Sequence, residues 1–168
     1  RPWVSASDVA AWRKAMPDVT FAIFRTTRSA RFEEVNDAPM GVAEVEPHFF
    51  DVIGVRPLMG GFSADHFVET STAGAAIISY ELWQARFDGA ADVIGRRVVR
   101  GSAAMVIVGV LPPGFVFPAR QQAQVLMPLR LSTPERTNPR LRPFEAIAHS
   151  VDVRRIDIAT TPELNLIM

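Results

Sequence analysis

Three residues in the first third of the chain have side chains that can bind metal ions. Glu44, Glu46 and His48 alternate in the sequence, so an extended backbone would place them on one face. Carboxylate and imidazole groups together are suitable zinc ligands. The other two histidines, His66 and His149, have no ligand-like spacing to this group, and a proline interrupts it. We therefore expect a solvated strand face here and no metal ligands.

A nucleophilic triad is the second chemical possibility in the sequence. Ser79 could act with His48 or His149 and with Asp51 or Asp88. The glycines that flank the serine of a nucleophile elbow are missing. Because Ser79 directly precedes a helix-forming segment, we expect it to cap that helix, and we expect no catalytic residue.

Glycine-rich segments and aromatic residues do not indicate a cofactor site. Gly60, Gly61 and Gly109 lack the downstream glycine, lysine or serine partners of a phosphate-binding loop. Trp12, Trp83 and the eleven phenylalanines could line a ligand pocket, but aromatic residues at helical spacing are far more often core. We expect them to be core residues, and we expect no cofactor.

Length and charge restrict the function classes. The 168 residues suffice for one domain or for two small lobes. Eighteen basic and eighteen acidic residues give zero formal net charge, so nucleic acid and anionic membrane surfaces are not expected partners. The chain has no cysteine and therefore no disulfide and no thiolate zinc site.

The longest uncharged stretch, residues 101–119, is nearly long enough to cross a bilayer. Pro112, Pro113 and Pro118 prevent a continuous helix there. We expect a buried strand followed by a turn, and no membrane segment. Because the chain starts without an apolar signal core and ends after an apolar run, we expect it to be a soluble segment of a longer protein.

The first third of the chain predicts a helix followed by strands. Val9, Trp12 and Met16 share one face of a helix that Ser5 or Ser7 can cap, and the proline after Met16 ends it. Residues that are β-branched and aromatic predict three strands, at 19–27, 31–35 and 41–46, with a turn at 36–39.

The rest of the chain predicts two helices and five strands. Pro47 and Gly54 limit a short helix, and Ser79 and Gly89 limit a longer one whose aromatic residues share a face. The expected strands are 75–78, 96–100, 104–111, 125–129 and the segment from Phe144 onward, the second and third forming a hairpin. The polar stretch 132–140 is predicted to be a linking loop.

Several short runs occur in a particular order along the chain. They are Val4–Ser5 with Trp12–Arg13, PHFFDVIGVRPLMGGFS at 47–63, AIISYELWQARF at 76–87, VIGRRV at 93–98, VIVGVLPPGFVFP at 106–118, and Pro128–Leu129. In the residues of these runs and in their order, the chain resembles the periplasmic core domain of MacB-like (FtsX/MacB-type) ABC transporter permeases. It is most similar to the large permeases that carry two such halves. It departs from the family pattern at Leu126, where a tryptophan is usual, and after Ala148.

This resemblance implies an α+β fold, in which a larger mixed α/β lobe carries an inserted smaller β-rich lobe. The larger (Porter-like) lobe would comprise residues 1–74 and 130–168 and be incomplete, and the smaller (Sabre-like) insert would comprise residues 75–129. The domain would lie in the periplasm, as the extracytoplasmic part of a bacterial inner-membrane permease.

The resemblance also implies a function without catalysis. Such a domain would relay conformational change from cytoplasmic ATP hydrolysis to substrate or partner proteins during export or efflux. The expected partners are a cytoplasmic ABC ATPase acting through the full-length permease, a permease dimer or pseudo-dimer, and a periplasmic adaptor. Two alternatives stay open: a freestanding ligand-binding module, and a small hydrolase or metalloenzyme.

Two loops are candidates for a contact surface within this function, residues 62–69 and 113–122. Loops lie at protein surfaces whether or not they bind a partner. Plain connection is therefore the interpretation we favour for both.

Overall fold

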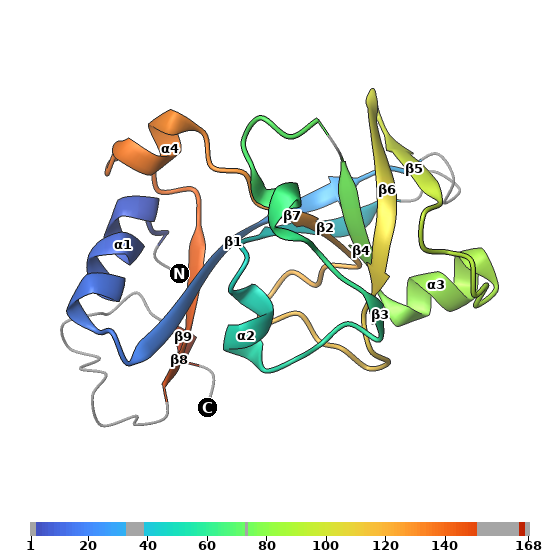
Figure 1. The fold of residues 1–168 in the computed structure, drawn as a ribbon, viewed down its shortest axis with the longest axis horizontal. Coiled ribbons are helices and arrows are strands. Elements are labelled where there is room, and N and C mark those ends of the chain that lie inside the picture. The colour runs from blue at the N-terminus through green and yellow to red at the C-terminus, as the bar shows by residue number, and fades with distance from the viewer. Residues whose placement is uncertain (1–2, 33–38, 73, 151–164, 167–168) are drawn as a thin grey trace. The chain divides into compact units, whose positions relative to one another are not determined.

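The computed structural model describes residues 3–32, 39–72, 74–150 and 165–166 (Figure 1). Its helices are α1 (Ala6–Ala15), α2 (Phe49–Ile53), α3 (Tyr80–Phe87), α4 (Thr133–Thr137) and the 3-10 helix η2 (Ala64–Phe67). Its strands are β1 (Val19–Ala30), β2 (Met40–Val45), β3 (Met59–Gly60), β4 (Ala75–Ile78), β5 (Arg97–Arg100), β6 (Ala103–Val110), β7 (Val125–Pro128), β8 (Glu145–Ser150) and β9 (Asn165–Leu166).

The strands form one mixed sheet in the order β3-β6-β4-β7-β2-β1-β8-β9, and β5 also pairs with β6. Strand β4 runs parallel to β6, and β8 runs parallel to β9. The β1–β8, β3–β6, β4–β7 and β5–β6 pairs are antiparallel. A mixed sheet with few helices confirms the expected α+β class.

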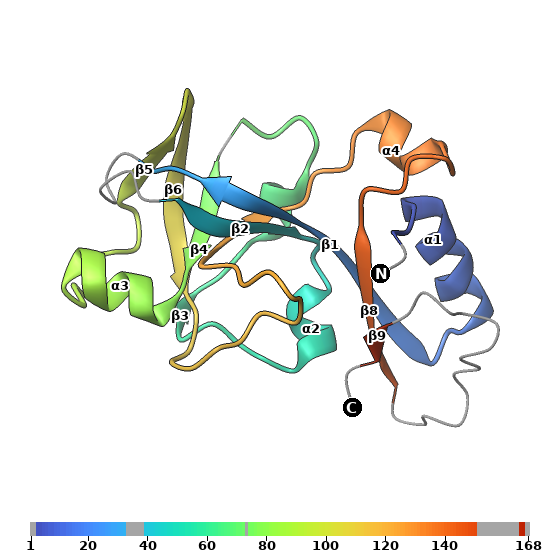
Figure 2. The same cartoon turned by 180° about the vertical axis from the view of Figure 1, so that it is seen from behind.

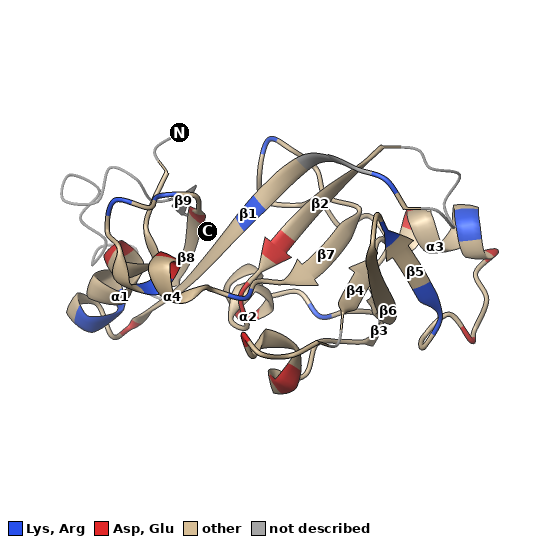
Figure 3. Ribbon diagram, turned by 90° about the horizontal axis from the view of Figure 1, so that it is seen from above, with Lys and Arg blue, Asp and Glu red and all other residues tan. Residues whose placement is uncertain are grey.

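The chain divides into two compact units, each assembled from separate segments. Unit 1 comprises residues 1–25, 45–55 and 129–168, and unit 2 comprises residues 26–44 and 56–128. The chain passes between units within β1 and near the end of β2. Charged residues occur on elements of both units (Figure 3).

The core of unit 1 lies between α1 and strands β1 and β8. Its buried residues are Val4, Val9, Val19, Phe21, Ile23, Leu129, Phe144, Ala146 and Ala148. Trp12 packs against this core, with its ring 6.0 Å from that of Phe21, as expected for a core aromatic residue. Helix α4 lies beside α1 (Figure 2).

Helix α1 begins where the sequence predicts. The hydroxyl of Ser5 accepts a hydrogen bond from the Asp8 N–H at 3.1 Å, and the Asp8 carboxylate accepts one from the Ser5 N–H at 2.9 Å. This reciprocal capping box satisfies two N–H groups that a helix start otherwise leaves unpaired. The predicted cap and helix are confirmed.

The core of unit 2 forms around β4, β6 and α3. Its buried residues are Phe32, Met40, Val42, Ala76, Ile78, Leu82, Val93, Val98, Met105, Ile107, Val110 and Val125. Trp83 packs against it and donates its indole N–H to the Ala90 carbonyl at 3.0 Å, so its predicted core role is also confirmed. The predicted hairpin is β5–β6, with Gly101 at a φ of 59° in the turn.

Most of the predicted elements are present, with two corrections. The stretch 132–140, predicted to be a loop, contains the helix α4. Strand β1 extends to Ala30, whereas Arg31 and Phe32 lie outside any strand, so the prediction of a strand starting at residue 31 is wrong. The remainder of that segment, the turn at 36–38, and residues 151–164 lie outside the described residues.

The uncharged stretch 101–119 consists of β6 and a following irregular loop, as predicted. Over the described ranges, we find no helix with the length and apolar character needed to cross a membrane.

Candidate functional site

Glu46 does not lie on a solvated face, contrary to the prediction. Strand β2 ends at Val45, and the Glu46 carboxylate is buried in unit 1, where it forms an ion pair with Arg13 of α1. The Arg13 guanidinium also donates to the Phe21 carbonyl at 2.8 Å, and the Glu46 N–H donates to the Ile23 carbonyl at 3.3 Å. The pair therefore connects α1, β1 and the end of β2.

The pKa of Glu46 is raised above its usual value because burial disfavours the carboxylate. The charge and hydrogen bond of Arg13 and the backbone contact to Ile23 oppose that rise but do not cancel it. Burial therefore has more influence on this carboxyl group than its cation does.

The metal candidates do not converge. Glu44 is half-buried on β2, and the exposed His48 lies 3.6 Å from Asp51, measured from Nδ1 to the carboxylate. Within the ranges 3–32, 39–72, 74–150 and 165–166, no three His, Asp or Glu side chains are arranged to hold a metal ion.

Ser79 has the role of a helix cap. Its hydroxyl accepts a hydrogen bond from the Leu82 N–H at 3.1 Å, at the start of α3. Asp88 ends the same helix in a left-handed conformation, with a φ of 51°. The two residues are separated by the whole length of α3, about 13 Å at 1.5 Å per residue, so they cannot share a proton relay.

The candidate contact loop 113–122 in unit 2 is held by hydrogen bonds at both ends. The Gly114 N–H donates to the Glu81 carboxylate at 3.2 Å. The Gln122 side chain accepts from the Phe117 N–H at 2.9 Å and donates to the Phe117 and Ala119 carbonyls at 3.1 and 3.0 Å. Phe117 is buried, whereas Val116 is 71% exposed. The loop therefore presents an apolar side chain from an ordered backbone.

The second candidate loop, 62–69, contains η2 and a small aromatic cluster. The Phe62 ring lies 5.5 Å from Phe67 and 6.1 Å from His66, both nearly edge to face. The His66 Nδ1 accepts from the Ser63 N–H at 3.0 Å. Val68, at the end of η2, is 50% exposed. This loop is also locally ordered, and its histidine contributes to its own turn.

A second ion pair in unit 1 was not predicted from the sequence. Arg25 of β1 donates to the Glu135 carboxylate of α4 at 2.6 Å. The Ser132 N–H and hydroxyl donate to the other carboxylate oxygen at 2.9 and 2.8 Å. Partial burial alone would raise the pKa of Glu135, but these hydrogen bonds and the charge of Arg25 outweigh burial and lower it. The sequence did contain a signal for the start of α4, because Ser132 and Glu135 have the Ser-x-x-Glu spacing of a capping box with a proline between them.

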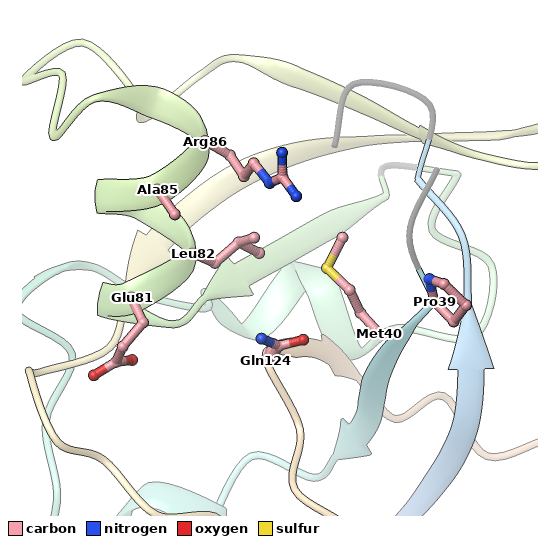
Figure 4. Close-up of a pocket in the computed structure, with 7 residues that line it drawn as sticks. All are labelled: Pro39, Met40, Glu81, Leu82, Ala85, Arg86 and Gln124. Carbon is pink, nitrogen blue, oxygen red and sulfur yellow. The ribbon is translucent and has the colours of Figure 1, made fainter. Parts of the chain in front are cut away.

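Unit 2 also contains an open hollow of about 360 Å³ that sequence analysis did not find (Figure 4). Its lining residues are Pro39, Met40, Glu81, Leu82, Ala85, Arg86 and Gln124. They come from the start of β2, from α3 and from the residue before β7. No local pattern connects three such separate segments, so the sequence contains no signal for this site.

Comparison with known families gives a match over nearly the whole chain. The model of the MacB-like periplasmic core domain family matches residues 1–165. A search of curated protein sequences gave no significant match.

Three solved structures have a similar fold. A domain of a protein assigned as a permease from Porphyromonas gingivalis is 20% identical, with a TM-score of 0.67 over 96% of this chain and 70% of that one. The extracellular domain of the noncanonic ABC-type transporter YknZ from Gram-positive bacteria is 17% identical, with a TM-score of 0.65; the match covers 95% of this chain and 78% of the YknZ domain. The periplasmic region of MacB from Actinobacillus actinomycetemcomitans is 14% identical, with a TM-score of 0.57; the match covers 74% of this chain and 55% of the MacB region.

Proposed function

Because the chain belongs to the family of MacB-like periplasmic core domains, we propose that it is a non-catalytic module that relays conformational change within a transporter. The change would originate in a cytoplasmic ABC ATPase, pass through the full-length permease, and reach substrate or partner proteins in the periplasm during export. A permease dimer or pseudo-dimer and a periplasmic adaptor are the partners we propose outside the membrane.

The observation that carries this proposal is the family match over residues 1–165. The positions of the side chains that could take part in catalysis or metal binding also support it. Ser79 caps α3, and Glu46 and Glu135 each form an ion pair with an arginine that is distant in sequence. These side chains have structural roles at a helix start and between segments distant in sequence, as a relay built from stiff, close-packed units requires.

The sequence alone favours plain connection for the loop 113–122, but its ordered backbone and the exposed Val116 lead us to propose it as the contact surface for partner proteins. Its backbone is held by Glu81 and Gln122, so presenting Val116 to a partner costs little additional ordering. A β-branched side chain that is 71% exposed also gains from being covered by an apolar partner surface.

The test uses the full-length permease that contains this domain, reconstituted with its ATPase in proteoliposomes. Val116→Asp is expected to lower the amount of substrate moved per ATP hydrolysed, while basal ATP hydrolysis stays unchanged. The matched control is Ile94→Asp, which alters another exposed apolar side chain of the same unit and is expected to leave transport unchanged.

Folding is checked on the 168-residue chain by thermal unfolding, where both variants should match the wild type, since surface substitutions seldom shift stability by more than about 0.5 kcal/mol. Normal coupling in the Val116→Asp permease would contradict the proposed contact surface. Transport that continues at the wild-type ratio after deletion of the whole domain would contradict the relay itself.

A further inference from the structure

The walls of the hollow in unit 2 are joined to one another by backbone hydrogen bonds. The Gln124 N–H donates to the Gly41 carbonyl of β2 at 2.9 Å, and the Ser79 N–H, at the start of α3, donates to the Gln124 carbonyl at 2.8 Å. Gln124 therefore connects the strand and the helix that form the two sides. Because backbone hydrogen bonds join its two sides, the hollow needs little reorganisation to accept a ligand.

The charged groups at the hollow are not equivalent. Glu81 accepts the Gly114 N–H, and Figure 4 shows its side chain pointing away from the other lining residues. Arg86 extends from α3 toward β2 in the same view, and it makes no ion pair or side-chain hydrogen bond with any residue that the structure describes. An exposed guanidinium carries five N–H donors in a planar arrangement that matches a carboxylate.

The remaining lining supplies an apolar surface and one amide. Met40 and Leu82 are almost fully buried and form the floor, with the exposed Pro39 and Ala85 beside them. The exposed side-chain amide of Gln124 lies across from Arg86 and can both donate to and accept from a peptide group (Figure 4). A hydrocarbon tail would leave this amide unused, whereas a peptide would pair with it.

We propose that this hollow binds the carboxyl-terminal residue of a peptide when that residue is aliphatic. Arg86 holds the carboxylate, the Met40–Leu82 floor contacts the aliphatic side chain, and Gln124 pairs with the preceding peptide group. The site is shallow and small, so the affinity for an isolated residue is weak, in the millimolar range. This binding does not depend on the proposed relay.

The test is a titration of the isotope-labelled 168-residue chain, followed by amide NMR. The probes are N-acetyl-leucine, its C-terminal amide, and octanoate. N-acetyl-leucine is expected to shift the signals of residues 82–86 and 124 saturably and to bind about fivefold more tightly than the amide, because only the acid pairs with Arg86. Octanoate, which has the carboxylate but no peptide group, is expected to bind more weakly than N-acetyl-leucine.

Two substitutions complete the test. Arg86→Gln is expected to abolish the preference for the acid over the amide, and Arg97→Gln, on β5 of the same unit, is expected to preserve it. Absence of saturable shifts at these residues, or an unchanged preference in Arg86→Gln, would overturn the proposal. Octanoate binding as tight as N-acetyl-leucine binding would overturn the assignment to a peptide. Because the readout is binding to the domain alone, a failed transport experiment does not affect it.

Discussion

Removing one member of the Arg13–Glu46 pair should change the free energy of unfolding by very different amounts depending on which member is removed. The Glu46 side chain is 9% exposed, whereas the Arg13 side chain is 39% exposed. Arg13→Met leaves a buried carboxylate without its cation. Glu46→Gln leaves a guanidinium that water already reaches and keeps an amide oxygen for it to donate to. We therefore expect Arg13→Met to be much the more destabilising substitution.

The expected magnitudes follow from this difference in exposure. Removing one partner of a fully buried pair costs about 3–5 kcal/mol, because the other charge is left uncompensated. Since the arginine side of this pair is solvated, we expect about 2 kcal/mol for Arg13→Met, including the lost bond to the Phe21 carbonyl. Glu46→Gln is expected to change the free energy of unfolding by less than about 0.5 kcal/mol at pH 7, or to raise it, because it removes the desolvation penalty.

The pH dependence gives a sharper test. The folded state raises the pKa of Glu46 above its ordinary value of 4.5, so it binds the proton more tightly than the unfolded chain does. The contribution of the Glu46 carboxyl to the free energy of unfolding is therefore fully present below the pKa of the unfolded chain. It is lost as pH rises through the pKa of the folded state. The difference in unfolding free energy, Glu46→Gln minus wild type, should therefore increase as pH rises above 4.5. Arg13→Met should steepen the loss, because it removes the cation that opposes the shift.

The assay is urea unfolding followed by tryptophan fluorescence, since Trp12 packs against the core of unit 1 that contains the pair. Arg96→Met is the matched control, because Arg96 forms a 2.6 Å pair with Asp92 in which both side chains are exposed. That control should cost less than about 0.5 kcal/mol. Glu46→Gln costing more than Arg13→Met, or a Glu46→Gln difference that does not vary with pH, would refute the reasoning.

Three further substitutions test other parts of the fold. Glu135→Gln should lower stability at pH 7 but not at a pH below the lowered pKa of Glu135, as pH-dependent urea unfolding would show, because a carboxyl with a depressed pKa loses its contribution as pH falls. Ser79→Ala should cost about 1 kcal/mol in urea unfolding and leave transport unchanged, and a loss of transport without a loss of stability would indicate chemistry at Ser79. Gly41→Ala should lower the melting temperature more than Gly54→Ala does, because a Cβ at Gly41 would overlap the Gln122 carbonyl, whereas Gly54 has open space and only a positive φ of 65°. Equal effects of the two alanines would show that the backbone at Gln122 yields.

The sequence predicted helix caps and turns correctly where they depend on hydrogen bonds and backbone angles within a few residues. The caps at Ser5 and Ser79 and the turn at Gly101 depend on residues within a few positions of each other. The same kind of information was present for α4, since Ser132 and Glu135 have capping-box spacing. The two prolines at 134 and 139 made the stretch resemble a loop, although a proline in the first turn is compatible with a helix.

The burial of Glu46 could not be predicted in this way. Alternation along a strand predicts the direction of side chains only while the strand lasts, and β2 ends one residue before Glu46. The countercharge that makes burial tolerable comes from Arg13, 33 residues earlier in the chain. The hollow at Met40, Arg86 and Gln124 escaped prediction for the same reason, because three segments distant in sequence have to meet before it exists.

The two ion pairs of unit 1 have a common structural role with opposite pH responses. Arg13–Glu46 and Arg25–Glu135 each join segments that are far apart in the sequence, within a unit built from three separate pieces of chain. Glu46 has one cation and deep burial, so its pKa rises, whereas Glu135 receives hydrogen bonds from Ser132 and Arg25 and its pKa falls. As pH falls toward 4.5, the contribution of Glu46 to stability rises, and as pH falls further, toward the lowered pKa of Glu135, the contribution of Glu135 is lost. Acidification therefore weakens only the contribution of Glu135, and a rise in pH weakens only the contribution of Glu46.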